Sequence, residues 1–259
     1  MDSPSRESPK VTPDEVVEEI PFENRIFQNF TKSKSGKPPQ YLEYFFQPMP
    51  SIDSRQLRIT NVSIYSTTPW KEANFISKAI INFYRGVANK FMSQDFQYEK
   101  SSVTFPITIT DATANIGGNT ISFYLNGITR VNAVEKDPLT CQILKHNLRV
   151  YGLPTETTIC GDYVDLYMKL DQDVVLIDAP WGGADYKKAN QLDLYLSNIN
   201  IVDICADLIS KSRASLIVLK LPVNYNFNEL IQRMPNCQFL THKVYRSQDH
   251  HSYNIVFCW

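Results

Sequence analysis

The chain has 259 residues, a formal net charge of −1 and a hydrophobic content of 43%, enough apolar side chain for one large folded domain. A charge near zero excludes a global positive field, so any contact with nucleic acid must be local. The five cysteines stand singly and their odd number argues against a disulfide framework, which suggests a reducing compartment. The apolar runs have only strand length and the N-terminus is polar, so we expect a soluble, intracellular protein without a membrane segment.

Three segments are predicted along the chain. Residues 1–19 are rich in Ser, Pro and Glu and carry too little apolar surface to offset the entropy of ordering them, so we expect a disordered tail. Residues 20–100 are expected to form a small N-terminal helical extension, in which Thr68 is the N-cap and Pro69 the first residue of a helix. Residues 101–259 are expected to form the main domain.

This main domain alternates short strands with amphipathic helices. Strands are predicted at 107–110, 130–134, 157–159, 174–177 and 215–221, and helices at 119–126, 138–151, 199–210 and 227–234. Such alternation is typical of a mainly parallel sheet with right-handed crossovers. Two more strands, 239–245 and 253–259, follow without an intervening helix. The predicted fold class is therefore α/β and Rossmann-like, with a mainly parallel sheet that ends in an antiparallel hairpin.

Acidic residues follow three successive strands of the predicted sheet. Asp111, Glu135 and Asp162 stand at carboxyl ends, where open α/β sheets bind their ligands. Glu135 occupies the place of the ribose-binding carboxylate of Rossmann-like sites and trails Asp111 by roughly 20 residues. These carboxylates suit S-adenosylmethionine. Asp111 can attract its sulfonium or its amine, Glu135 can accept hydrogen bonds from its ribose hydroxyls, and Asp162 can accept one from its adenine amine.

A glycine turn, Gly117-Gly118, lies between the first two of these acids. Glycine at this place would allow a ligand to approach the backbone closely. The dinucleotide pattern G-x-G-x-x-G is not satisfied, and S-adenosylmethionine, which has no pyrophosphate to cradle, is therefore favoured over NAD. The alternative is a turn without a ligand.

A second motif, Asp178-Ala179-Pro180-Trp181-Gly182-Gly183, follows the apolar strand 174–177. The exocyclic amine of a base is a poor nucleophile because its lone pair is delocalised into the ring. Hydrogen bonds from the amine to Asp178 and to a neighbouring carbonyl would localise this lone pair and aim it at a sulfonium methyl. Trp181 would stack on the base, with a cation–π contribution if the base were 7-methylguanine. The alternative is a strand-terminating turn with Trp181 packed locally.

Beyond these patterns, the chain resembles the trimethylguanosine synthase family from about Tyr65 to the C-terminus. The motifs that carry the resemblance lie at 65–69, 117–121, 137–152, 160–162 and 180–186. The resemblance implies a class I methyltransferase fold, S-adenosyl-L-methionine as cofactor, and a 7-methylguanosine cap or capped RNA as partner, methylated on the exocyclic N2. It is closest to a minimal version of the family, as in protists or large viruses.

The resemblance also implies a set of site residues. The cofactor-binding residues are expected to be Thr68, Pro69, Asp111, Thr113, Asn115, Gly117, Asn119, Glu135, Lys136, Asp162, Tyr163 and Asp178. The catalytic residues are expected to be Asp178, Pro180 and Trp181, without a metal, since methyl transfer needs none and the four histidines show no ligand spacing. The family has Ser-Pro or Asn-Pro where Asp178-Ala179 stand, and Asp178 is the stronger acceptor.

Other functions remain open at this point. Lys71, Asp178 and Lys220 match part of the Lys-Asp-Lys-Glu set of cap 2′-O-ribose methyltransferases, in which a basic amine deprotonates a hydroxyl, but Ser252-Tyr253-Asn254 stands where the fourth acid is expected. The motif at 178–181 is also near the Asp-Pro-Pro-Trp of adenine-N6 methyltransferases. A catalytically decayed cap-binding protein is the alternative outside enzymes.

Four residues are candidates for contacts with the cap phosphates, by their position in the sequence only. They are Lys187, Lys188, Arg213 and Arg246. As surface charges they are more often solvated bystanders than ligands. A monomer is favoured.

Overall fold

The computed structural model describes residues 40–60, 62–84, 105–247 and 250–259. The tail predicted at 1–19 lies outside these residues, as do 20–39 and 85–100 of the predicted helical extension. Within the described part of the chain, no helix is long and apolar enough to cross a membrane.

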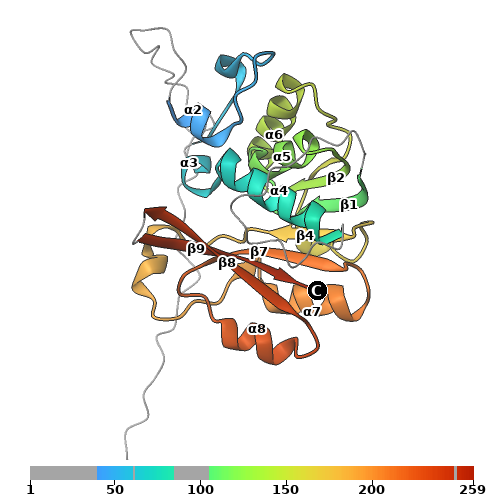
Figure 1. Cartoon of the computed structure of the whole chain (residues 1–259), viewed down its shortest axis with the longest axis vertical. Coiled ribbons are helices and arrows are strands. Elements are labelled where there is room, and N and C mark those ends of the chain that lie inside the picture. The colour runs from blue at the N-terminus through green and yellow to red at the C-terminus, as the bar shows by residue number, and fades with distance from the viewer. Residues whose placement is uncertain (1–39, 61, 85–104, 248–249) are drawn as a thin grey trace, which may run out of the picture.

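A single seven-stranded sheet, in the order β3-β2-β1-β4-β7-β9-β8, organises the molecule (Figure 1). Its strands are β1 (Phe105–Asp111), β2 (Ile128–Glu135), β3 (Thr158–Cys160), β4 (Val174–Ile177), β7 (Leu216–Pro222), β8 (Phe239–Ser247) and β9 (His250–Cys258). The first five in this order run parallel, and β9 is antiparallel to both β7 and β8. The prediction of a mainly parallel Rossmann-like sheet that ends in a hairpin is confirmed.

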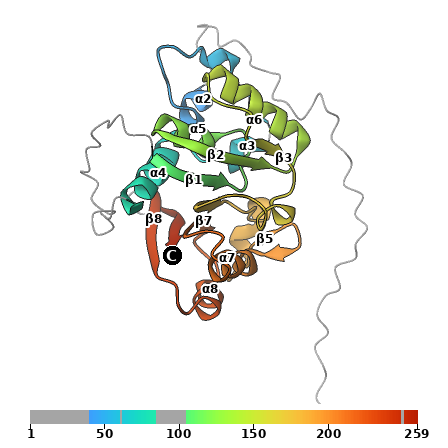
Figure 2. The same ribbon diagram turned by 90° about the vertical axis from the view of Figure 1, so that its right-hand side faces the viewer.

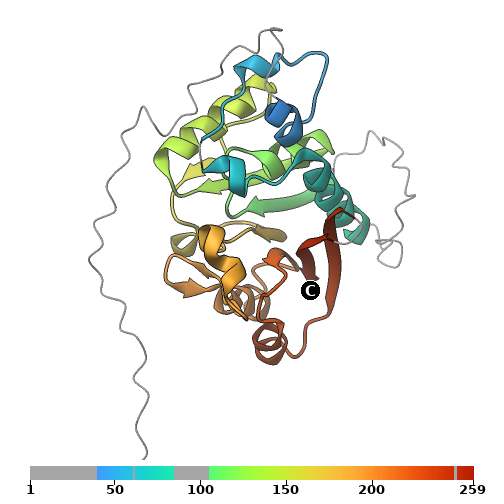
Figure 3. The same cartoon turned by 90° about the vertical axis from the view of Figure 1, so that its left-hand side faces the viewer.

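Helices cover both faces of the sheet (Figures 2 and 3). The longer ones are α4 (Trp70–Tyr84), α5 (Gly118–Leu125), α6 (Pro138–Val150), α7 (Ile201–Ser210) and α8 (Phe227–Arg233). Shorter elements are α2 (Gln40–Phe45), α3 (Ser63–Ser66), η1 (Ser54–Gln56), η3 (Tyr163–Asp165), η4 (Gly183–Lys188) and the hairpin of β5 (Tyr195–Leu196) and β6 (Ile199–Asn200).

The core lies on the two faces of the sheet, because successive strand residues point to opposite faces. In β4, Val174 and Leu176 pack in the cluster that contains α4 and α5, whereas Val175 and Ile177 pack in the cluster that contains α7 and α8. All four side chains are fully buried. This double burial explains why β4 reads as a continuous apolar run.

Two helices begin later than predicted. The carbonyl of Pro69 accepts from the Ala73 amide at 2.9 Å, so α4 begins at Trp70 and not at Pro69. The hydroxyl of Thr68, predicted to cap this helix, lies 3.3 Å from Lys220 Nζ and accepts from Asn119. Helix α7 begins at Ile201 because the two preceding residues belong to β6.

Asn147 ties the N-terminal segment to the sheet-bearing part of the chain. Its side chain in α6 is completely buried. It accepts from the Arg58 amide at 2.9 Å and donates to the carbonyls of Arg58 and Ile116 at 2.9 and 3.0 Å. Because Ile116 directly precedes the glycine turn, this amide holds the segment before α3 against that turn.

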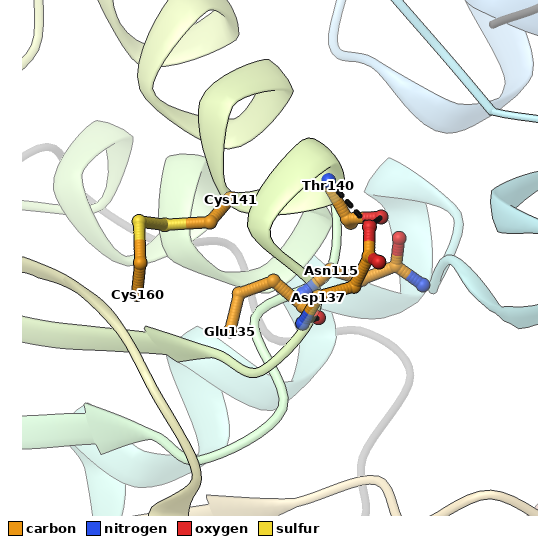
Figure 4. The surroundings of a disulfide bond; sticks show 6 residues. All are labelled: Asn115, Glu135, Asp137, Thr140, Cys141 and Cys160. Atoms are coloured by element: carbon orange, nitrogen blue, oxygen red, sulfur yellow. Dashed lines mark hydrogen bonds between the residues drawn. A yellow bond between two sulfur atoms is a disulfide. The ribbon is translucent and has the colours of Figure 1, made fainter. Parts of the chain in front are cut away.

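A disulfide joins Cys141 in α6 to Cys160 at the end of β3, with their Cα atoms 5.6 Å apart (Figure 4). The sequence-based argument against a disulfide was therefore wrong. The residues are 19 apart in the sequence, and the crossover that packs α6 beside β3 brings them together, which a count of cysteines does not detect. The expectation of a reducing compartment loses this support.

We predict that Asn147→Ala lowers the free energy of unfolding by about 2 to 3 kcal/mol, because it leaves the buried Ile116 carbonyl and the partly buried backbone groups of Arg58 without this partner. Urea unfolding followed by circular dichroism measures the change. Gln142→Ala, at an exposed position of the same helix, is the matched control and should be close to neutral. Equal stability of the two variants would contradict the anchoring role of Asn147.

Candidate functional site

The candidate site lies at the carboxyl edge of the sheet, where three neighbouring parallel strands end. Strand β1 lies between β2 and β4 and pairs with both, so the residues at their ends are brought to one edge. These residues are Asp111, Glu135 and Asp178. Asp162 follows β3, the next strand along. The sheet thus brings together the four carboxylates that the sequence singled out.

Asp111 is 1% exposed. Thr120 donates its hydroxyl to Asp111 Oδ2 at 2.7 Å, and Oδ1 is buried without a partner in the described residues. Burial raises the pKa of Asp111 to about 7, opposed by the Thr120 hydrogen bond, and the charges of Asp178 and Glu135 raise it further. A cationic donor placed here would both satisfy Oδ1 and stabilise the carboxylate.

Glu135 shapes the loops around it. Its Oε2 accepts from the Asn115 amide and its Oε1 from the Asp137 amide, both at 2.8 Å. Burial raises its pKa, and these two hydrogen bonds oppose the shift. Asn115 has a left-handed φ of 49° and exchanges hydrogen bonds with Ser63 and Ser66 at 2.7 Å. Each carboxylate oxygen keeps further acceptor capacity for a ligand hydroxyl.

Asp162 belongs to a polar cluster with Lys136 and Ser197. Its Oδ2 lies 2.7 Å from Lys136 Nζ and accepts from the Ser197 hydroxyl, while Oδ1 accepts from the Val164 amide at 3.2 Å. Burial would raise the pKa of Asp162, but the hydrogen bonds from Lys136 and Ser197 outweigh it and lower the pKa. Tyr163, in contrast, is 2% exposed and its ring packs in the core, so its side chain has a structural role.

The glycine turn is explained first by contacts within the protein. A Cβ on Gly118 would lie 2.7 Å from the Thr68 carbonyl oxygen and 2.9 Å from Thr67 Cγ2. Gly117 has φ +104°, and a Cβ there would meet Leu144 at 2.9 Å. The sequence-based explanation, close approach of a ligand, is therefore incomplete, because Gly118 lets the segment before α4 lie on the turn.

Asp178 forms a buried ion pair with Lys220 of β7. Asp178 Oδ2 lies 2.7 Å from Lys220 Nζ, and the side chains are 13% and 9% exposed. The Asp178 amide also donates to the Thr113 hydroxyl at 3.0 Å. Burial raises the pKa of Asp178, and the charge of Lys220 opposes this shift. Lys220 of β7 thus holds the carboxylate, and Thr113, in the loop after β1, holds the backbone of Asp178.

Trp181 is half-buried among aromatic rings. Its ring centroid lies 5.2 Å from that of Tyr186, edge to face, and 6.1 Å from that of Tyr253 in β9. The ammonium of Lys220 lies 5.6 Å from the Trp181 centroid, and the indole Nε1 is buried without a partner in the described residues. Local packing therefore accounts for part of this side chain, while Pro180 beside it is exposed.

Sequence reasoning placed Lys220 only in the ribose-methylating alternative and did not identify it as the partner of Asp178. The signal was present, since β7 reads Leu-Ile-Val-Leu-Lys-Leu-Pro and is buried throughout, and a lysine in such a strand requires a partner. Lys71, the third residue of that alternative, is exposed, and its ammonium lies 5.7 Å from the Trp70 ring.

The four candidates for phosphate contacts differ in their surroundings. Lys187 lies over the ring of Tyr186, which contacts Trp181, and Lys188 pairs with Asp185. Arg213 donates to the Leu170 carbonyl at 2.8 Å and so has a structural partner. The side chain of Arg246 lies outside what the structure describes.

The residues at the strand ends fit S-adenosylmethionine. Asp111 Oδ1 and Asn119 Oδ1 are both buried acceptors without partners in the described residues, and unpaired buried acceptors are costly unless a donor reaches them. The ammonium of the cofactor supplies such donors. Within the described residues, no group of three or more His, Cys, Asp or Glu could hold a metal ion.

Comparison with known proteins agrees with this chemistry. A family model described as RNA cap guanine-N2 methyltransferase matches residues 107–256. The trimethylguanosine synthase of Schizosaccharomyces pombe is 33% identical over 131 residues, 48% of this chain and 46% of that protein. The uncharacterized protein L320 of Acanthamoeba polyphaga mimivirus is 27% identical over 228 residues, 83% of this chain and 88% of that protein.

A solved structure of similar arrangement is the 16S rRNA N2 G1207 methyltransferase of T. thermophilus in complex with AdoMet and guanosine. It is 14% identical and covers 70% of this chain and 41% of that one, with a TM-score of 0.46.

We predict that Gly118→Ala weakens both folding stability and S-adenosylmethionine binding, because the added methyl group clashes with a backbone oxygen and lifts the segment at Thr68 off the turn. Thermal melting and calorimetry measure the two effects. Gly161→Ala, whose Cβ would meet only ordinary contacts of 3.8 Å and longer, is the stability control. A Gly118→Ala protein that melts and binds like the wild type would refute this close contact.

The raised pKa of Asp111 predicts a pH dependence. Because the folded state holds this proton more tightly than the unfolded state, the free energy of unfolding of the free protein should fall as pH rises from 3.8 toward about 7. A bound cation favours the carboxylate, so S-adenosylmethionine should bind more tightly as pH rises toward about 7 and then level off. Calorimetry in buffers of different ionisation enthalpy should detect proton release below pH 7.

Asp111→Asn should abolish this proton release. Asp171→Asn changes an exposed aspartate and should leave it unchanged. Cofactor binding that is independent of pH in the wild type would refute the assignment to Asp111.

Proposed function

Because the chain belongs to the RNA cap guanine-N2 methyltransferase family, we propose that it methylates the exocyclic N2 amine of a 7-methylguanosine cap on RNA. The chain is an S-adenosylmethionine-dependent methyltransferase, and the proposal adds the acceptor. The observation that carries it is the pairing of a buried carboxylate, Asp178, with a half-buried indole, Trp181, at the same sheet edge.

The cofactor side of the proposal uses the strand-end carboxylates. Asp111 and Asn119 would bind the ammonium of the cofactor, since both present buried acceptors without partners in the described residues. Glu135 would accept from the ribose hydroxyls and Asp162 from the adenine amine. When bound, S-adenosylmethionine supplies an electrophilic methyl carbon on a sulfonium, which leaves as a neutral thioether.

The acceptor side uses the motif after β4. The exposed part of the Trp181 ring would stack on the guanine, a contact that a positively charged 7-methylguanine strengthens. Asp178 would accept a hydrogen bond from the N2 amine and orient its lone pair. The amine must lose a proton when its nitrogen gains the methyl carbon, and the Asp178 carboxylate is the base in reach. Lys187 and Lys188, in η4 directly after the motif, would face the cap phosphates.

Ribose 2′-O-methylation is the second candidate, and the Asp178–Lys220 ion pair is the observation that favours it. In that reaction a lysine amine would take the proton of a ribose hydroxyl. The stretch Ser252-Tyr253-Asn254, however, stands in β9 where the fourth residue of that set should be an acid, and Lys71 is exposed. Guanine N2 is therefore the preferred acceptor.

We predict that the protein transfers label from S-adenosylmethionine to N2 of 7-methyl-GTP but not of unmethylated GTP, because only the methylated base is cationic. Trp181→Ala should lower kcat/KM by about tenfold or more, the usual contribution of a base stacked on an aromatic ring. Calorimetric binding of S-adenosylmethionine should be unchanged by this substitution.

The control for aromatic loss is Tyr245→Ala, at an exposed position of β8, which should keep full activity. A 7-methyl-capped RNA that already carries 2′-O-methyl on its first nucleotide separates the acceptors. Label on ribose or on internal adenine would reject the N2 proposal. Binding of 7-methyl-GTP without cofactor binding or transfer would instead support a cap-binding protein, whereas cofactor binding without any transfer would leave the acceptor unidentified.

A further inference from the structure

The ammonium of Lys220 stands between the carboxylate and the aromatic rings of the acceptor site. Lys220 is only 7% exposed and belongs to a strand buried along its whole length. Its Nζ contacts Asp178 Oδ2 at 2.7 Å and lies 3.3 Å from Thr68 Oγ1. It also lies 5.6 Å from the ring centroid of Trp181 and 5.2 Å from that of Tyr253. The Lys220 side chain therefore contacts Asp178, the proposed proton acceptor, and Thr68, in the segment before α4. It also lies over the aromatic rings of Trp181 and Tyr253.

Among the described residues, the other titratable groups that interact with Asp178 are a carboxylic acid and a phenol. Asp111, at the end of β1, interacts with Asp178 electrostatically. Tyr253, from β9, also does so and donates its hydroxyl to Glu72 of α4. From β7, the strand on the other side, comes Lys220. The lysine is thus the cation that compensates a carboxylate buried among other acids, and a buried carboxylate without such compensation takes up a proton.

Protonation of Asp178 would remove the hydrogen-bond and proton acceptor that the amine needs. A carboxylate accepts hydrogen bonds and can take a proton, whereas a carboxylic acid donates one and has less acceptor capacity. With Oδ2 held by Lys220 and the backbone amide held by Thr113, the carboxylate has a fixed orientation. The Thr68 hydroxyl also hydrogen-bonds the carboxylate, and the acceptor capacity left beyond these partners is what the amine would use.

We propose that Lys220 is a positioning residue for methyl transfer, which keeps Asp178 ionised and holds its carboxylate in place for the acceptor amine. This inference rests on the proposed function. Asp178 takes the proton that the amine loses, and Lys220 takes no part in the proton transfer. If Lys220 were instead the general base, as ribose methylation would require, its neutral substitutions would remove activity equally at every pH.

Lys220→Met and Lys220→Gln test this inference through the pH profile of kcat/KM with 7-methyl-GTP. Without the ammonium, Asp178 should ionise at higher pH, so the acid limb of the profile should move upward by about one pH unit or more. Activity should recover at alkaline pH. Lys220→Arg should restore most of the wild-type profile, and Lys243→Met, at an exposed position of β8, should not change it.

Equal loss of activity at every pH in both neutral variants would overturn the inference, as would loss of activity in Lys220→Arg alongside them. Binding of S-adenosylmethionine and thermal melting show that each variant is folded. Two neutral variants, Lys220→Met and Lys220→Gln, are used so that the test can still be made with one of them if the other misfolds.

A second readout does not depend on the acceptor. The Asp178 carboxyl can be titrated by NMR in protein labelled with ¹³C at aspartate Cγ, with its resonance assigned by its loss in Asp178→Asn. Lys220→Gln should shift this titration to higher pH, and an unchanged titration would overturn the inference. Failure of the wild type to methylate 7-methyl-GTP would reject the proposed function alone.

Discussion

Carboxylates buried at the ends of neighbouring parallel strands are the constraint on which this site depends. Removing a carboxylate from water is costly unless donors or a counter-charge surround it. The chain supplies these locally: the Thr120 hydroxyl for Asp111, the amides of Asn115 and Asp137 for Glu135, and the ammonium of Lys220 for Asp178. These hydrogen bonds hold the loops at this edge in their conformations. The acceptor capacity that remains on the carboxylate oxygens is available to ligands.

The Asp178–Lys220 pair also bears on the departure of this chain from the family it resembles. A serine or asparagine at the position of Asp178 is neutral and needs no counter-charge. A carboxylate in the same buried place requires a cation, and Lys220 on the adjacent strand provides it at 2.7 Å. The two residues are best regarded as one unit, because removing either partner leaves the other as a buried charge without compensation.

Much of the architecture was accessible from the sequence, because the strands and helices of the main domain carry clear periodicity and β4 was predicted at its observed bounds. The acids at strand ends followed from the parallel topology. What could not be predicted depends on contacts between distant segments: the disulfide between Cys141 and Cys160, the packing of the Thr68 carbonyl against Gly118, and the partner of Lys220. The roles of the site residues toward ligands remain proposals.

The position of β9 has a consequence for how the protein is made. Among the strands of the sheet, β9 comes last along the chain, yet it lies between β7 and β8 and pairs with both. A nascent chain still held on the ribosome before residue 250 therefore presents two unpaired strand edges, β7 and β8, whose backbone groups are open to association with other chains. The sheet can be completed only when residues 250–258 have paired with both strands.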